Sequence, residues 1–257
     1  MKKKAEKIRE KWMPTAKTEA RKIPLVIGNL KVKDSRKQQA FFDPSQPGMP
    51  AVYSVELATA DDVTGAVKIA REDSCNWRDT ELSERHELLG KVAVNMRKKR
   101  GDLIGAAASV CGKTFYESDP EVSEAIDFVE YYPYSLRLLE SSTSLSLSPL
   151  GVVLVIPPWN FPIAIPAGGV AAALAGGNTV LLKPSPLALP LGAEIAQCFW
   201  EAGIPQEALQ LVTCEDGETV RSLSGHPDVD AIIFTGGTRT ALKLLESRPD
   251  VELSAET

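Results

Sequence analysis

Apolar and polar positions alternate along the second half of the chain in a repeating strand-and-helix pattern. Short apolar runs typical of buried strands lie near 151–157, 178–183, 209–213, 230–234 and 251–255. Stretches with the composition of helices fill the gaps, at 162–175, 187–202, 217–223 and 238–245. Strands that alternate with helices form parallel sheets covered on both faces. The pattern therefore predicts an α/β fold with a doubly wound, Rossmann-like parallel sheet.

The first half of the chain predicts helices and short β pieces before that sheet. Apolar spacing indicates helices that start near Thr59 and Ser83 and at about Pro120, the second running to about residue 110 and the third to about residue 139. Short β-like pieces are expected at 24–33, around a tight turn at Gly28-Asn29, and at 51–57. Helices and short β pieces are thus expected to precede the sheet.

Two segments of the first half are expected to lie outside the main body. Residues 1–22 are charged and predict a loosely held helix or arm. In 141–148, serines alternate with Leu145 and Leu147, which predicts a half-exposed strand that projects from the body and pairs with another strand.

Composition narrows the functional classes. The 257 residues are 44% hydrophobic and 25% charged, as in a soluble globular protein, and no run reaches the length of a membrane span. The N-terminus is basic but lacks the apolar core of a signal peptide, so a cytoplasmic location is expected. A net charge of −5 with scattered signs argues against nucleic-acid binding.

The spacing of the cysteines and histidines in the sequence matches neither a metal site nor a histidine-based catalytic triad. Cys75, Cys111, Cys198 and Cys214 show no metal-ligand spacing, and we interpret all four as structural thiols that stay reduced. The two histidines lie in a charged helical stretch and in a turn, so the sequence predicts no metal site.

Two polar side chains follow buried strands of the predicted sheet. The run 151–157 ends on prolines and then presents Asn160, whose amide either donates to an oxyanion or caps the helix that follows. Lys183 ends the next strand, where it is either an ordinary solvated lysine or a ligand for ribose hydroxyls and phosphate. In open α/β sheets, ligands bind at the carboxyl ends of the strands.

The last two strands end on features of the same kind. Gly236 and Gly237 join a strand to a helix, and free backbone amides there suit a pyrophosphate, although Ala241 keeps the motif from being a full GxGxxG. Glu256 is a carboxylate at a strand end, where a glutamate is ordinarily solvated. Because all four features fall at carboxyl ends of strands, together they predict one ligand site.

The motifs around these residues resemble the NAD(P)-dependent aldehyde dehydrogenase superfamily over nearly the whole chain. The resemblance rests on PWNFP at 158–162, AGGNTVLLKPS at 175–185, FTGGT at 234–238 and Glu256 in the AET ending. The segment at 111–132, CGKTFYESDPEVSEAIDFVEYY, is most similar to the 1-pyrroline-5-carboxylate dehydrogenase branch, which includes the C-terminal half of bifunctional proline utilisation proteins.

The resemblance implies a cofactor, a substrate class and a set of roles. Asn160 would stabilise the oxyanion and Glu256 would be the general base, in the oxidation of an aldehyde, here L-glutamate γ-semialdehyde, to a carboxylic acid. NAD is the implied cofactor; NADP stays open because Pro186 stands where many NAD-preferring members carry a glutamate. The implied partners are a small aldehyde and, at full length, further copies of the chain. The implied cofactor-binding residues are Ile156, Pro157, Pro158, Trp159, Lys183, Ser185, Gly236, Gly237 and Thr238.

One departure from the family pattern limits what the chain is expected to do. The family's nucleophilic cysteine follows the glutamate, whereas all four cysteines here precede Glu256. We therefore expect an N-terminal part of such an enzyme, with an arm at 1–22 and a cofactor-binding domain at 23–257, inactive by itself. Alternatives are a non-catalytic nucleotide-binding or interaction module, or a fragment of an enzyme that reduces acyl phosphates or acyl thioesters.

Overall fold

A five-stranded parallel sheet forms the centre of the molecule. The structure is a computed structural model that describes residues 2–28, 30–31, 36–141, 145–215 and 217–257. The strands lie in the order β10-β9-β6-β7-β8, and every neighbouring pair is parallel. This sheet confirms the predicted α/β fold class. Its strands are β6 (Val152–Ile156), β7 (Thr179–Leu182), β8 (Leu209–Leu211), β9 (Ala231–Thr235) and β10 (Glu252–Glu256).

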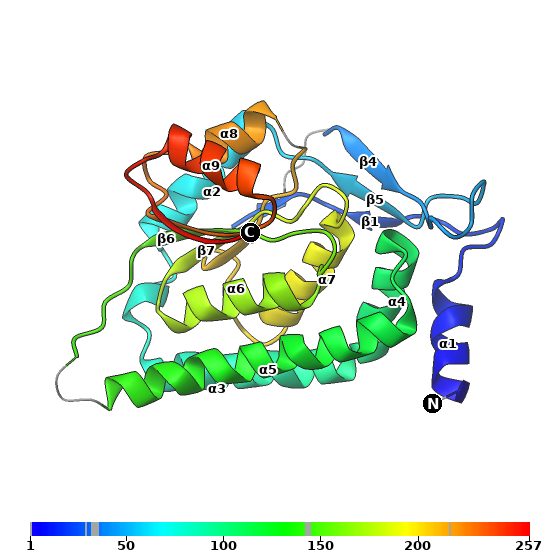
Figure 1. The fold of residues 1–257 in the computed structure, drawn as a ribbon, viewed down its shortest axis with the longest axis horizontal. Helices are drawn as coiled ribbons and strands as arrows, with labels where there is room; N and C mark the ends of the chain where they lie inside the picture. The colour runs from blue at the N-terminus through cyan, green and yellow to red at the C-terminus, as the bar shows by residue number, and fades with distance from the viewer. Residues whose placement is uncertain (1, 29, 32–35, 142–144, 216) are drawn as a thin grey trace.

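Helices cover both faces of the sheet (Figure 1). The alternation of side chains in β6 shows why. Val153 and Val155 join the core on one face, and the other three residues, Val152, Leu154 and Ile156, join the core on the opposite face. The first face is covered by α6 (Ala164–Ala175) and α7 (Leu189–Trp200). The second is covered by α2 (Ala60–Glu72), α8 (Glu218–Ser224) and α9 (Thr238–Ser247).

A layer of long helices lies beyond α6 (Figure 1). The predicted single helix from Ser83 to about 110 is wrong: the chain forms α3 (Leu82–Lys98) and α4 (Arg100–Cys111), because Lys99 leaves the helical conformation and glycine follows at position 101. The third predicted helix, α5 (Phe115–Glu140), begins before Pro120, since Thr114 and Glu117 form a capping box.

Short strands in the described N-terminal part of the chain form two small sheets that are separate from the main sheet. The expected strand at 51–57 is β5 (Tyr53–Glu56), which lies between β1 (Arg21–Ile23) and β4 (Gln38–Phe41). Neither of these two neighbours was predicted from the sequence. β2 (Val26–Ile27) and β3 (Leu30–Lys31) pair antiparallel on either side of the expected turn, and Gly28 has a φ of 55°, which favours glycine. Asn29, the other residue of the expected turn, lies outside the described residues.

The first residues form a helix that is anchored by one aromatic side chain. Helix α1 (Lys2–Trp12) packs against α4, and Trp12 is buried there. Gly105 makes room for it, because a Cβ at that position would lie 2.2 Å from the Trp12 ring. The division into an arm at 1–22 and a domain at 23–257 stays a prediction.

The described residues of the segment after α5 form no strand. Ser141 is in the turn that ends α5, residues 142–144 lie outside the described part, and 145–150 run without strand pairing. The side chains of Leu145 and Leu147 are exposed. The predicted pairing of 141–148 with a strand of another chain therefore stays a prediction.

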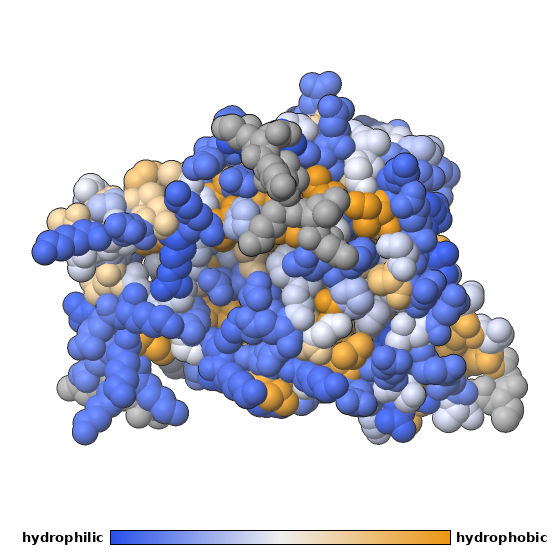
Figure 2. Space-filling model, turned by 180° about the vertical axis from the view of Figure 1, so that it is seen from behind, coloured by the Kyte–Doolittle hydropathy of each residue, from blue (hydrophilic) through white to orange (hydrophobic). Residues whose placement is uncertain are grey.

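The surface seen from behind is mostly hydrophilic, with apolar positions in small separate groups (Figure 2). Within the described ranges, no helix is both long and apolar enough to cross a bilayer.

Candidate functional site

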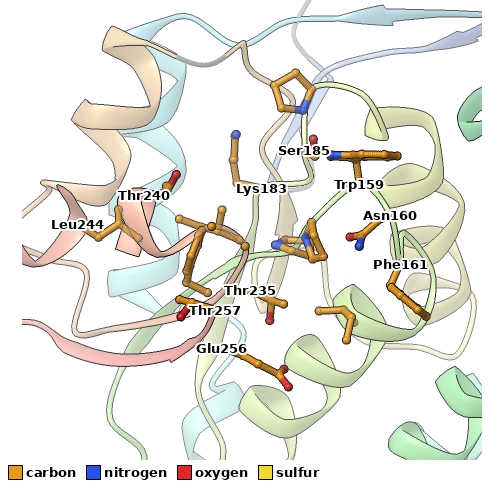
Figure 3. A pocket seen from close by; sticks show the side chains of 18 of the residues that line it. Trp159, Asn160, Phe161, Lys183, Ser185, Thr235, Thr240, Leu244, Glu256 and Thr257 are labelled. Atoms are coloured by element: carbon orange, nitrogen blue, oxygen red, sulfur yellow. The ribbon is translucent and has the colours of Figure 1, made fainter. Parts of the chain in front are cut away.

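A cavity of about 710 Å³ lies where β6, β7 and β9 end (Figure 3). A volume of this size suits a small-molecule ligand or a cofactor. Ten of the eleven site residues predicted from the sequence line it, and Thr238, the first residue of α9, does not. The ten are Ile156, Pro157, Pro158, Trp159, Asn160, Lys183, Ser185, Gly236, Gly237 and Glu256.

Asn160 lies in the exposed turn between β6 and α6. The residue at the N-cap of α6 is Ile163, so Asn160 does not cap this helix, and that alternative is wrong. Among the residues that the structure describes, none makes a hydrogen bond with the side-chain amide of Asn160. The amide is therefore available to a ligand in the cavity.

The start of α6 is capped by Glu121, a carboxylate on α5 that the sequence reasoning missed. Its Oε1 accepts hydrogen bonds from the backbone N–H groups of Ile163, at 2.8 Å, and Ala164, at 3.2 Å. Glu121 is 2% exposed although it is an acid. The sequence did carry a signal, because Glu121 stands four residues before Ala125 on the apolar face of the predicted helix.

Lys113 joins this capping carboxylate to the turn. Its Nζ lies 2.7 Å from Oε2 of Glu121 and donates to the backbone carbonyl of Asn160 at 2.7 Å. The same ammonium lies 4.4 Å from the centre of the Phe161 ring, within cation–π range. The Lys113–Glu121 ion pair thus contacts the turn at both ends. Lys113 binds the backbone of Asn160, and Glu121 binds the first residues of α6.

Lys183 ends β7 and is 2% exposed. The interpretation as an ordinary solvated lysine is therefore wrong. Its backbone N–H donates to the carbonyl of Val155 at 2.9 Å, which fixes the end of β7 against β6. Ser185 lines the same cavity, which therefore offers both a cation and a hydroxyl to a ligand.

The turn from β9 to α9 forms the opposite side of the cavity (Figure 3). At Gly236, a Cβ would lie 2.6 Å from the ring of Phe234, so this position has no room for a side chain. At Gly237, the N-cap of α9, a Cβ would meet nothing within 4 Å. The backbone at Gly237 is thus open to the cavity, next to the unpaired N–H groups that begin any helix.

Glu256 is the last residue of β10, and its exposed carboxylate lines the same cavity as Asn160. Its backbone carbonyl accepts a hydrogen bond from the N–H of Gly236 at 3.0 Å, which ties β10 to the glycine turn. Burial, followed by the charge of Glu256, raises the pKa of Tyr132 on α5. The carboxylate and the amide predicted from the sequence therefore face one common space.

None of the four cysteines lines this cavity in the described part of the chain. Burial raises the pKa of Cys75 to about 11 and the pKa values of Cys111 and Cys198 to about 12. Such thiols are protonated at neutral pH and are poor nucleophiles. The described residues also contain no cluster of three or more His, Cys, Asp or Glu side chains that could hold a metal ion.

Comparisons with known proteins agree on one family. The sequence model of the aldehyde dehydrogenase family matches residues 32–255. The chain is 30% identical over 239 residues to a 1-pyrroline-5-carboxylate dehydrogenase of Bacillus pumilus, covering 89% of this chain and 46% of that protein. It is 37% identical over 214 residues to the bifunctional protein PutA of Escherichia coli, covering 82% of this chain and 16% of that protein.

Solved structures agree with the sequence comparisons. A 1-pyrroline-5-carboxylate dehydrogenase from Thermus with bound NAD superposes with a TM-score of 0.86 at 29% identity, over 100% of this chain and 52% of that one. The chain thus spans about half the length of the 1-pyrroline-5-carboxylate dehydrogenases that it matches.

Proposed function

Because this chain belongs to the aldehyde dehydrogenase family, we propose that it is the cofactor-binding part of an enzyme that oxidises an aldehyde to a carboxylic acid. One observation carries the proposal: Asn160, Lys183, the Gly236-Gly237 turn and Glu256 line a single cavity at the carboxyl ends of the strands. A parallel sheet binds dinucleotides at this edge.

The residues around the cavity fit NAD. Gly237 and the start of α9 suit the pyrophosphate, because backbone N–H groups and the helix dipole attract an anion there. Lys183 and Ser185 suit the adenosine ribose, and the strand end at 156–159 suits the rest of the dinucleotide. When bound, the nicotinamide supplies a hydride acceptor. The Thermus structure with bound NAD supports this cofactor, and Pro186 leaves NADP as an alternative.

Asn160 and Glu256 have separate roles in the proposed reaction. The amide of Asn160 donates a hydrogen bond to the aldehyde oxygen as that atom gains negative charge, which stabilises the tetrahedral state. The carboxylate of Glu256 accepts a proton from the water that releases the acid. Asn160 has no hydrogen-bond partner among the described residues and Glu256 is exposed, so both groups are available for these tasks.

The nucleophile has to come from outside these 257 residues. None of the cysteines lines the cavity, and three of them have a raised pKa. We therefore expect the chain to bind the cofactor without oxidising aldehydes. The names of the relatives, 1-pyrroline-5-carboxylate dehydrogenase and the bifunctional protein PutA, support L-glutamate γ-semialdehyde, an intermediate of proline catabolism, as the substrate of the whole enzyme. Pairing of 141–148 between copies is a separate expectation from the alternating pattern of this segment.

Titration with NADH, followed by its fluorescence, tests the proposal. We expect saturable binding that weakens about tenfold or more in Lys183→Met, because a charge-assisted contact is lost. Lys91→Met removes an exposed lysine from α3 and should bind like the wild type. Failure of the wild type to bind NADH and NADPH would refute the cofactor site, and aldehyde oxidation by the chain alone would refute the proposed need for an external nucleophile.

A further inference from the structure

We propose that Lys113 and Glu121 are positioning residues that fix the direction of the Asn160 amide. The inference rests on the proposed function, which makes this amide the donor to the aldehyde oxygen. Neither residue lines the cavity, so neither touches a ligand there. Both act through the turn that carries Asn160.

Glu121 fixes the far end of the turn. A buried carboxylate is costly unless each oxygen has partners. Here Oε1 accepts from two backbone N–H groups, those of Ile163 and Ala164, whereas Oε2 makes no hydrogen bond to a described residue and has the Lys113 ammonium at 2.7 Å as its counter-charge. The charge also lies at the positive end of the α6 dipole. The first residues of α6 are therefore bound to α5 by a charged side chain as well as by apolar packing.

Lys113 fixes the near end of the turn. The ammonium carries three donors, and it faces Oε2 of Glu121, the carbonyl of Asn160 and the ring of Phe161. The backbone of Asn160 is thus joined through Lys113 to the carboxylate that also holds Ile163. Only two residues lie between these two points, so the turn has little freedom to rotate.

The pair has a positional role beyond stability. A buried ion pair is often matched or exceeded in stability by well-packed apolar side chains, so stability alone does not explain it. The amide of Asn160 has no hydrogen bond to a described side chain that would aim it, so its direction follows from the backbone that Lys113 and Glu121 hold. A donor aimed at a developing charge must be preorganised to be effective.

The test measures the Asn160 side chain directly, by the heteronuclear NOE of its 15N-labelled amide group in this chain. Loss of that signal in Asn160→Asp assigns it. In Lys113→Met, we expect a lower NOE and backbone amide exchange at Ile163 and Ala164, whose N–H groups donate to Glu121, about tenfold faster or more, because the charge-assisted bond to the turn is gone. Arg97→Met on α3 removes the cation of an exposed ion pair with Glu130, which lies on α5 as Glu121 does, and is the matched control.

The double variant Lys113→Met with Glu121→Gln separates positioning from stability. It leaves no unpaired buried charge, and glutamine can still accept from Ile163 and Ala164, so we expect the free energy of unfolding to recover while the Asn160 amide stays mobile. A wild-type NOE in the double variant would overturn the proposal, including in the case where Lys113→Met alone does not fold. NADH binding reports the proposed function separately, because the NOE needs no cofactor.

Discussion

The two sides of the cavity are held in different ways. On the α6 side, made of residues 157–164, the buried pair Lys113–Glu121 binds the turn at three backbone groups. On the α9 side, made of residues 235–244 and β10, α9 buries only Ala241 and Leu244, and no residue of β10 is buried. The α6 side is held by a charged pair inside the molecule, whereas on the α9 side the helix is held by two buried side chains and β10 by its backbone pairing with β9.

The two sides also differ in the kind of group that they present to the cavity, a side chain on the α6 side and backbone on the α9 side. The α6 side presents the amide of Asn160, and a side chain works as an oxyanion donor only when its direction is set in advance. The α9 side presents backbone at Gly236 and Gly237, whose donors are aimed by the helix itself. A side that acts through its backbone therefore needs fewer supporting side chains.

The largest expected effect comes from breaking the α6 side. Glu121→Ala leaves the Lys113 ammonium, whose side chain is only 13% exposed, without its counter-charge and two buried N–H groups without their acceptor. We expect the free energy of unfolding to fall by about 3–5 kcal/mol. Urea denaturation followed by circular dichroism measures it.

Glu130→Ala is the matched control for this variant. Glu130 lies on the same helix and pairs with Arg97 at 2.8 Å, but both side chains are about half exposed. Water screens such a pair, so we expect a loss of at most about 1 kcal/mol. Equal losses in the two variants would show that the Lys113–Glu121 pair is no more important than a surface pair.

The α9 side is expected to depend on one leucine. Leu244→Ala removes one of the two buried side chains of α9 and should lower the free energy of unfolding by about 2 kcal/mol, the low end for such truncations, because Leu244 is 6% exposed. Leu242→Ala, two residues away and 54% exposed, should change it by less than about 0.5 kcal/mol. Similar results for the two would mean that α9 is not anchored through Leu244.

Sequence reasoning predicted the sheet and brought Asn160, Lys183, the Gly236-Gly237 turn and Glu256 to one edge of it because both depend on local patterns, whereas the other predicted cavity residues came from the resemblance to the family. Continuous apolar runs mark strands covered on both faces, and the residues after them must lie at the carboxyl edge. The pair at Lys113 and Glu121 joins a helix to a turn about 40 residues later, and no local pattern announces such a contact. The two interpretations of Lys183 stayed open at the level of sequence for the same reason, since its burial depends on the surrounding tertiary structure.

The two glycines of the α9 side should separate stability from binding. Gly236→Ala would place a Cβ 2.6 Å from the Phe234 ring, so we expect a loss of about 1–3 kcal/mol in unfolding free energy. Gly237→Ala meets nothing within 4 Å at a φ of −74°, so stability should hold while NADH binding weakens. Thermal unfolding and NADH titration of both variants give the result. Unchanged NADH affinity in Gly237→Ala would argue against a close approach of the cofactor to this turn.

The smallest expected effect concerns Cys111, which reports the charges on the α6 side. Burial, then the charge of Glu121, raises the pKa of this thiol to about 12, and Lys113 lowers it. Its thiolate is therefore scarce at pH 8 and increases about tenfold with each pH unit up to that value. Glu121→Gln removes a cause that raises the pKa and should speed alkylation at pH 8, whereas Lys113→Met should slow it, each by about two- to fivefold.

Mass spectrometry of alkylated peptides measures these rates, with Cys75 as the internal control because neither Lys113 nor Glu121 contributes to its raised pKa. If alkylation of Cys111 becomes faster in Glu121→Gln and slower in Lys113→Met, the thiol responds to the charges of these two residues and the turn at Asn160 keeps its structure. Faster alkylation in both would mean instead that the α6 side has opened around the thiol. In that case the contrast between a fixed and a weakly held side would depend on the intact ion pair alone, because apolar packing would not keep the α6 side closed without it.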